Sequence, residues 1–106
     1  MKAFHAHLYY NEDSYQSALK IIEKAKTLDY VSVGTAHKKP VGPHPVWSCQ
    51  FLFKTSDLNV MIPWLLKNHE GLTFFIHGLS GDDLKDHTDY VMWIGKKYKL
   101  NLSIFE

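Results

Sequence analysis

The sequence predicts an α+β protein, a ferredoxin-like βαββαβ sandwich followed by a C-terminal extension. Apolar patterns of strand and helix type alternate as strand, helix, strand, strand, helix and strand over residues 4–77, the element order typical of that fold. The chain has 106 residues, of which 45% are hydrophobic, which is enough for a core and excludes intrinsic disorder. Neither an internal repeat nor a linker is visible, so we expect a single domain over residues 1–106.

The first half of the predicted sandwich begins with a strand over residues 4–10, in which every second residue is apolar. A helix follows, with apolar residues at helical spacing over residues 15–25. Residues 29–36 are expected to form a second strand. The apolar face of the first strand must meet the helices, so its other face is open. That open face carries His5, His7 and Tyr9.

The second half begins with a loop over residues 38–45, where three prolines and a glycine within six residues permit neither helix nor sheet ladder. An aromatic strand is predicted over residues 46–54. A helix is expected over residues 62–69, with Pro63 tolerated at its first position. A fourth strand over residues 72–77 completes the sandwich.

The extension, residues 78–106, contains a loop rich in glycine and aspartate. We expect a short helix over residues 86–93 and a final strand over residues 100–105.

Charge and cysteine content exclude several classes of function. Twelve basic and eleven acidic residues give a formal net charge of +1, and no basic block is present, so neither nucleic acid nor a membrane surface is an expected partner. The single cysteine, Cys49, excludes an intramolecular disulfide and a cysteine-based zinc site. No secretory leader is apparent and no segment approaches the roughly 20 apolar residues of a membrane span, so a cytoplasmic location is expected.

Seven histidines suggest a metal site on the open face of the sheet. Residues two apart on a strand lie roughly 7 Å apart on one side, so His5 and His7 can reach the same ion. The fourth strand should pair antiparallel with the first, which places His77 beside His5. Three neutral imidazoles would suit iron, zinc or copper. The alternative is a pair of half-exposed polar residues without a metal.

Further polar residues lie in the loops. His44 stands between two prolines that fix its backbone and can present its ring as a functional loop would. Taken by itself, however, the motif favours a rigid turn with a solvated histidine ring. The predicted topology puts His37 and His44 near the opposite end of the sheet from His5 and His77. Asp82 and Asp83 are expected to cap the helix that follows them.

Five spaced motifs follow one another across nearly the whole chain. They are HAHLY at residues 5–9, VGPHP at 41–45, IH at 76–77, GDD with DHT at 81–88, and WIG at 93–95. Together, and in this order, they resemble the DOPA 4,5-dioxygenase family. In that family the histidine of the fourth strand is commonly followed by proline, whereas Gly78 follows His77 here.

The resemblance implies a homodimeric extradiol dioxygenase that opens a catechol such as L-DOPA with Fe(II) and O2. Zinc could replace iron in a purified sample. The usual iron triad contains one carboxylate, so Asp82 or Asp86 could replace one histidine. The predicted ligands are His5, His7 and His77; the predicted proton-transfer residues are His44 and His87; the predicted substrate contacts are Tyr9, His37 and Lys38.

The absence of arginine affects the expected substrate. A carboxylate is usually held by a bidentate guanidinium, which this chain cannot supply. Lys38, Lys39 or a protonated histidine would have to serve instead. This weaker contact predicts a broad preference among catechols or a modest affinity for L-DOPA itself.

Two other functions are compatible with the sequence. A zinc-dependent enzyme of different chemistry on the same fold would use the same histidines. A dimeric ligand-binding protein without catalytic activity would use exposed aromatic residues, for which Tyr9, Tyr10 and Phe75 are candidates.

Overall fold

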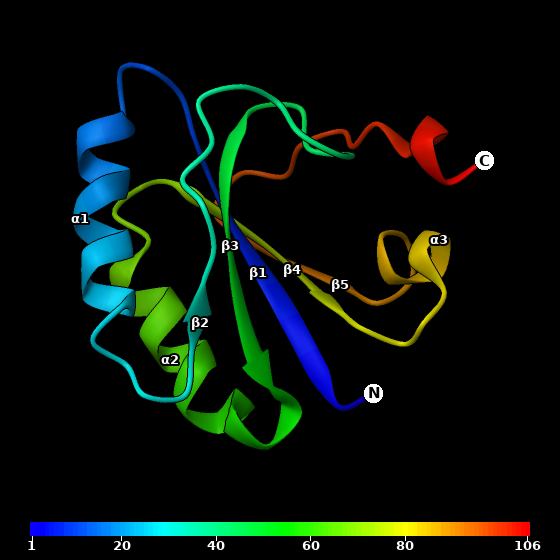
Figure 1. Cartoon of the computed structure of the whole chain (residues 1–106), viewed down its shortest axis with the longest axis horizontal. Coiled ribbons are helices and arrows are strands. Elements are labelled where there is room, and N and C mark those ends of the chain that lie inside the picture. Colours follow the sequence, from blue (N-terminus) through cyan, green and yellow to red (C-terminus); the bar gives the residue numbers. More distant parts are fainter.

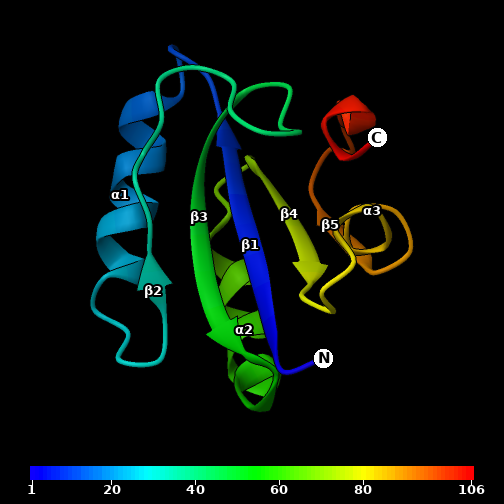
Figure 2. The ribbon, with the colours of Figure 1, turned by 45° about the vertical axis from the view of Figure 1, so that its right-hand side comes forward.

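The computed structural model describes residues 1–106 and has the predicted α+β architecture (Figure 1). Two helices cover one face of a single sheet. The C-terminal residues and a one-turn helix lie on the other side (Figures 1 and 2). No helix has the length and apolar character that a membrane crossing requires. The elements are β1 (Ala3–Tyr10), α1 (Tyr15–Ala25), β2 (Ser32–Val33), β3 (Trp47–Lys54), α2 (Leu58–Asn68), β4 (Thr73–Gly78), α3 (Asp83–Asp86) and β5 (Val91–Ile94).

The sheet confirms the ferredoxin-like prediction and adds one strand to it. Its order is β2-β3-β1-β4-β5, and every neighbouring pair is antiparallel. β1 and β3 lie at the centre of the predicted four strands, and β5 extends the sheet beyond β4. The two longest strands, β1 and β3, are rich in aromatic residues, and both have a neighbouring strand on each side.

The core forms between the sheet and the two long helices. α1 turns one stripe of its surface inward, and its buried residues include Ile21 and Ile22. α2 contributes Met61 and Leu65, which are both fully buried. Burial of each such side chain stabilises the fold by about 1.5–3 kcal/mol. The packing of α1 and α2 against one face of the sheet therefore stabilises the position of the strands. The opposite face is thereby left for the polar residues of β1.

The register between strands determines which residues share that open face. In β1, His5 lies directly opposite His77 of β4 and opposite Leu52 of β3. Directly opposed residues of an antiparallel pair point to the same side of the sheet. A shift of β1 by one residue would turn His5 and His7 toward the helices, and the apolar alternation of β1 prevents this.

The C-terminal extension differs from its prediction. The predicted helix over residues 86–93 is wrong, because α3 ends at Asp86 and Val91–Ile94 pairs with β4 as β5. The predicted strand over residues 100–105 is wrong as well, because Leu102–Phe105 forms a 3-10 turn. In both places the apolar run is too short for its spacing to distinguish a helix from a strand, and its conformation depends on whether it pairs with the edge of the sheet.

Two other elements differ in their bounds. The strand predicted over residues 29–36 is reduced to Ser32–Val33. α2 begins earlier than predicted, at Leu58, so Pro63 lies inside the helix instead of at its first position. A 3-10 turn over Thr55–Asp57 leads directly into α2, which moves the start of the helix toward the N-terminus.

Gly95, which follows β5, adopts a backbone conformation that other residues rarely accept. Its φ is 89°, and a Cβ added there would lie 2.6 Å from the carbonyl oxygen of Leu72. We therefore expect Gly95→Ala to lower the free energy of unfolding by roughly 2–4 kcal/mol, as measured by urea denaturation. Gly81→Ala is the matched control, since φ is 97° there but no atom lies within 4 Å of an added Cβ. An equal loss in the two variants would contradict a role for the close contact.

Candidate metal centre

Three histidines from β1 and β4 meet on the open face of the sheet. Ring nitrogens of His5, His7 and His77 all lie within 4.8 Å of one another. The two Nε2 atoms of His7 and His77 are 3.1 Å apart. Ligand nitrogens bound at about 2.1 Å to one ion lie close to 3 Å apart, so this pair already has the spacing of a metal site. The structure thus brings together all three predicted ligands.

The surroundings orient these imidazoles. His77 is 2% exposed, and its Nδ1 lies 3.0 Å from the carbonyl oxygen of Gly78. A carbonyl only accepts, so Nδ1 carries the proton and donates it, and the lone pair of Nε2 faces His7. A hydrogen bond from the distal ring nitrogen is the usual partner of a metal-bound histidine, because it sets both the tautomer and the ring orientation.

Burial keeps the three rings neutral at pH 7. Desolvation lowers the pKa of His77 to about 4, although the hydrogen bond to Gly78 opposes that change. Burial, followed by the neighbouring imidazoles, lowers the pKa of His7 well below its ordinary value. The pKa of the half-buried His5 is also lowered, first by desolvation and then by His87. Neutral imidazole is the form that ligates a metal, so the donor set fits a divalent transition-metal ion.

His44 also lies at this cluster, where the family resemblance predicted it as a proton-transfer residue, and not at the opposite end of the sheet, where the predicted topology alone put it. Its ring centre is 4.0 Å from that of His7, and its Nδ1 is 2.6 Å from the hydroxyl of Tyr9. The loop that bears it is held by the backbone N–H of Asn101, which donates to Pro43 at 2.8 Å. Desolvation, followed by the nearby histidines, lowers the pKa of His44 to about 4.

His87 approaches the cluster from the other side. Its ring centre is 4.2 Å from that of His77. Its Nδ1 donates to the carbonyl oxygen of Asp83 at 2.7 Å, which leaves Nε2 with a free lone pair. Phe105, from the C-terminal turn, stacks near the same ring at 4.6 Å. His44 and His87 therefore flank the three candidate ligands from two different loops.

The acidic residues of the extension have structural partners. Asp82 caps α3, where its carboxylate accepts from the backbone N–H of Lys85. Asp86 is 2% exposed, and its carboxylate accepts from the backbone N–H and the hydroxyl of Ser80. Neither belongs to the group of ring nitrogens that could hold an ion. The capping role predicted for Asp82 is thus confirmed.

The remaining predicted substrate contacts lie in different surroundings. Tyr9 is 1% exposed, and its hydroxyl is directed at His44. The backbone of His37 binds Tyr10 and Ser48, through its carbonyl oxygen and its N–H respectively. The Nζ atom of Lys38 lies 4.8 Å from the ring centre of Tyr15, at the start of α1. Substrate binding by His37 and Lys38 stays a prediction.

The aromatic residues proposed for an exposed interface are buried. Tyr9, Tyr10 and Phe75 are between 0% and 3% exposed. Tyr10 lies in the core on the helix side, where its hydroxyl donates to two backbone carbonyls. Phe75 packs beneath the cluster, with its ring centre 6.0 Å from that of His7. These side chains cannot form the surface that a purely ligand-binding dimer would need.

An apolar cavity of about 350 Å³ adjoins the cluster, and sequence reasoning missed it. Its floor includes Phe75 and His87, and Trp93 stacks on Phe75 at 4.5 Å. Apart from Phe75, the residues that line it all follow β4, in the part of the chain where the predicted helix and strand are wrong. The other lining residues are Thr88, Val91, Lys97, Tyr98, Lys99, Leu100 and Leu102.

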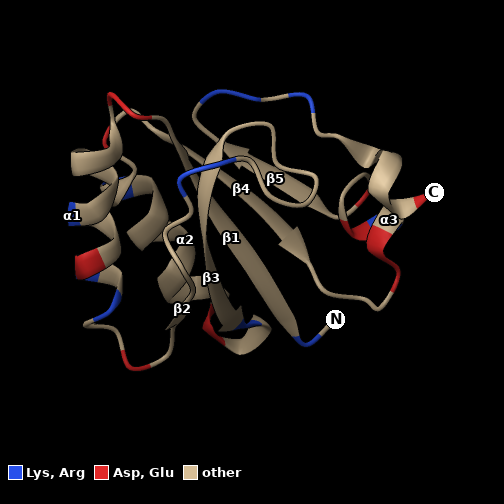
Figure 3. Ribbon diagram, turned by 45° about the horizontal axis from the view of Figure 1, so that its top comes forward, with Lys and Arg blue, Asp and Glu red and all other residues tan.

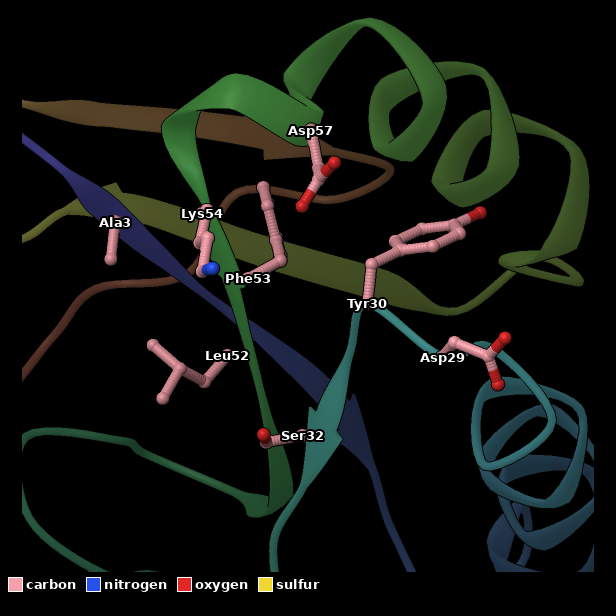
Figure 4. A pocket seen from close by; sticks show the side chains of 8 residues that line it. All are labelled: Ala3, Asp29, Tyr30, Ser32, Leu52, Phe53, Lys54 and Asp57. Carbon is pink, nitrogen blue, oxygen red and sulfur yellow. The ribbon is translucent and has the colours of Figure 1, made fainter.

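A second cavity, of about 460 Å³, lies away from the histidines (Figure 4). It opens beside β2, at the sheet edge opposite β5, and Leu52 and Tyr30 are among the side chains that surround it. None of the seven histidines lines it. This second cavity therefore lacks the imidazole ligands of the histidine cluster.

Comparison with known proteins identifies relatives of the whole chain. Residues 4–104 match the model of the Dopa 4,5-dioxygenase family. A DOPA 4,5-dioxygenase of Amanita muscaria is 27% identical over 97% of this chain and 49% of its own length. An uncharacterized 21.2 kDa protein of Botryotinia fuckeliana is 28% identical over 96% of this chain and 62% of its own. The chain thus spans about half to three fifths of the length of these relatives.

A solved structure agrees with both fold and family. A Nostoc punctiforme protein, described as a candidate dioxygenase, superposes with a TM-score of 0.92 at 34% sequence identity. The match covers 96% of this chain and 89% of that one. Together with the family match over residues 4–104, these observations show that the chain belongs to the Dopa 4,5-dioxygenase family.

Proposed function

We propose that the chain is an extradiol ring-cleaving dioxygenase that acts on a catechol, such as L-DOPA, with Fe(II) and O2. The observation that supports this most strongly is the group of three neutral imidazoles beside an aromatic cavity. A non-haem iron site needs few protein ligands, because substrate and dioxygen take the remaining positions. Membership of the family and the likeness to the Nostoc protein support the same reaction class.

In this proposal His5, His7 and His77 hold the iron. Bound Fe(II) would supply the redox chemistry by which dioxygen is added across a carbon–carbon bond of the catechol ring. The cavity beside His87 accepts the ring, and its apolar walls exclude water from that side.

The flanking histidines move protons. The rings of His44 and His87 lie next to those of His7 and His77, so either imidazole can accept a proton from a catechol hydroxyl and return it later. Tyr9 acts as a positioning residue, because its hydroxyl is bound to Nδ1 of His44 and sets the direction of that ring. The proton acceptor is therefore fixed before substrate arrives.

The proposal is tested by oxygen uptake. Protein loaded with Fe(II) without oxygen is mixed with air-saturated 4-methylcatechol or L-DOPA, and uptake and absorption of the yellow ring-opened product are followed. We expect one O2 consumed per product formed. The same protein loaded with Zn(II) is the control. Absence of oxygen uptake with every catechol would overturn the proposal.

A second candidate is a zinc-dependent enzyme of other chemistry. The observation in its favour is that no carboxylate joins the three imidazoles, whereas the common iron triad contains one. Elemental analysis of protein purified without added metal separates the two candidates, together with the oxygen-uptake assay. The family resemblance also leads us to propose a homodimer, which light scattering would test.

Removal of the Tyr9 hydroxyl should impair catalysis more than stability. We expect Tyr9→Phe to lower kcat by about 10–100-fold, as is typical when a supporting hydrogen bond is lost, with bound metal retained. The free energy of unfolding should change by only about 1 kcal/mol. Tyr10→Phe is the matched control, because its hydroxyl bonds only backbone carbonyls on the helix side. Equal activity in Tyr9→Phe and Tyr10→Phe would contradict the positioning role.

A further inference from the structure

We infer that Lys97 and Lys99 bind the anionic group of the substrate, such as the carboxylate of an aromatic amino acid, at the cavity beside His87. This inference rests on the proposed function, because it assigns a substrate contact at the same site. Neither lysine belongs to the motifs of the sequence, and both follow β5, whereas Lys38 lies at Tyr15.

The cavity has an aromatic interior. Phe75, Trp93 and Tyr98 line it, and the rings of Phe75 and Trp93 pack against each other with their centres 4.5 Å apart. Its volume of about 350 Å³ lies at the small end of the range for ligand pockets. A monocyclic aromatic compound with a short substituent fits such a space, with its ring against His87.

The charge of the cavity lining has a single sign. Lys97 and Lys99 both line it, and no aspartate or glutamate does. The only salt bridge of the chain joins Lys26 to Glu23 on α1, so neither rim lysine is neutralised by a carboxylate. In Figure 3 the connection between β5 and the C-terminal turn carries blue, lysine-bearing segments and no red, acidic ones. Free ammonium groups at the mouth of an aromatic pocket are complementary to an aromatic anion.

The neighbouring lysine has a different position. The Nζ atom of Lys96 lies 5.1 Å from the ring centre of Tyr98, and Lys96 does not line the cavity. The two lysines that do line it are separated by one residue. With no arginine in the chain, these ammonium groups are the cations available at this rim. An ammonium binds as a point charge without bidentate geometry, so a moderate contribution to affinity is expected from each.

The test compares a charged and a neutral catechol. For the Fe(II)-loaded protein, we expect KM for 3,4-dihydroxyphenylpropionate to rise about 3–10-fold in Lys97→Gln or Lys99→Gln, and further in the double variant. The KM for 4-methylcatechol should stay within twofold. Lys67→Gln, at the end of α2, is the matched control for loss of one positive charge. A larger effect of Lys38→Gln than of the double variant would overturn the inference.

A binding measurement separates this inference from the proposed reaction. Metal-free protein is titrated with 3-phenylpropionate and with its neutral amide, and binding is followed by calorimetry and by tryptophan fluorescence, since Trp93 lines the cavity. We expect the acid to bind more tightly, by about 3–10-fold, with the difference lost in the double variant and at high salt. Equal binding of acid and amide overturns the inference. Lack of oxygen uptake, with the acid still preferred, overturns the proposed reaction alone.

Discussion

His77→Ala is expected to remove bound metal and to lower the rate of catechol-dependent oxygen uptake by a factor on the order of 10³ or more. His77 is buried, is oriented by Gly78 and faces His7 at 3.1 Å, so no other side chain can take its place. Loss of a supporting partner of a ligand already costs about 10–100-fold, and loss of the ligand itself costs more. Metal content by elemental analysis and the initial rate of oxygen uptake check this prediction.

His69→Ala is the matched control for His77→Ala. His69 also bonds a backbone carbonyl through Nδ1, that of Leu72, but it lies outside the cluster at the end of α2. Its variant should keep full metal content. His5→Ala tests the same site at a more exposed position, where an alanine disturbs the packing less. Stoichiometric metal in both His77→Ala and His5→Ala would refute the assigned ligand set.

Acid should destabilise the metal-free protein well above the pH at which carboxylates titrate. The pKa values of His44 and His77 are about 4 in the folded state, against 6.5 for a free histidine. As pH falls from 6.5 toward 4, the unfolded chain takes up protons that the folded chain cannot, so the free energy of unfolding decreases. One pKa unit corresponds to about 1.4 kcal/mol, so we expect the two groups together to cost roughly 5 kcal/mol between pH 7.5 and pH 4.5.

Urea denaturation at several pH values between 7.5 and 4.5 checks this expectation. The double variant His44→Asn, His77→Asn should show a shallower decrease, because it lacks the two groups. Ile22→Val, in the core of α1, is the control that lowers stability by about 1 kcal/mol without removing a titrating group. Parallel pH profiles for the wild-type protein and the double variant would disprove the assignment.

The histidine triad could be predicted because it depends on local alternation and simple topology. The apolar residues of β1 must face the helices, which leaves His5 and His7 outward. Pairing of the fourth strand with the first then places His77 opposite His5. The first step uses the alternation of apolar and polar residues along a strand, and the second uses the antiparallel pairing expected from the order of elements. Both the alternation and the element order can be read from the sequence.

The predicted topology put His44 at the wrong end of the sheet, and only the family resemblance placed it at the metal, because its position depends on contacts between distant segments. Tyr9, which lies 35 residues earlier in the chain, hydrogen-bonds to the ring of His44. The backbone N–H of Asn101, which lies much later in the chain, donates to Pro43 in the same loop. The cavity was missed for the same reason, since its walls come from β5 and the C-terminal segment. Val91–Ile94 is too short for its pattern to separate helix from strand, and only the edge of β4 makes it a strand.

The pairing of β1 with β4 also has a consequence for the order of assembly. His7 and His77 are 70 residues apart in the chain, so their rings meet only after a long loop has closed and most of the sheet exists. An unfolded chain offers an ion only the local pair of His5 and His7. A metal ion therefore cannot act as a nucleus for folding, and its tight binding reports that the native topology is complete.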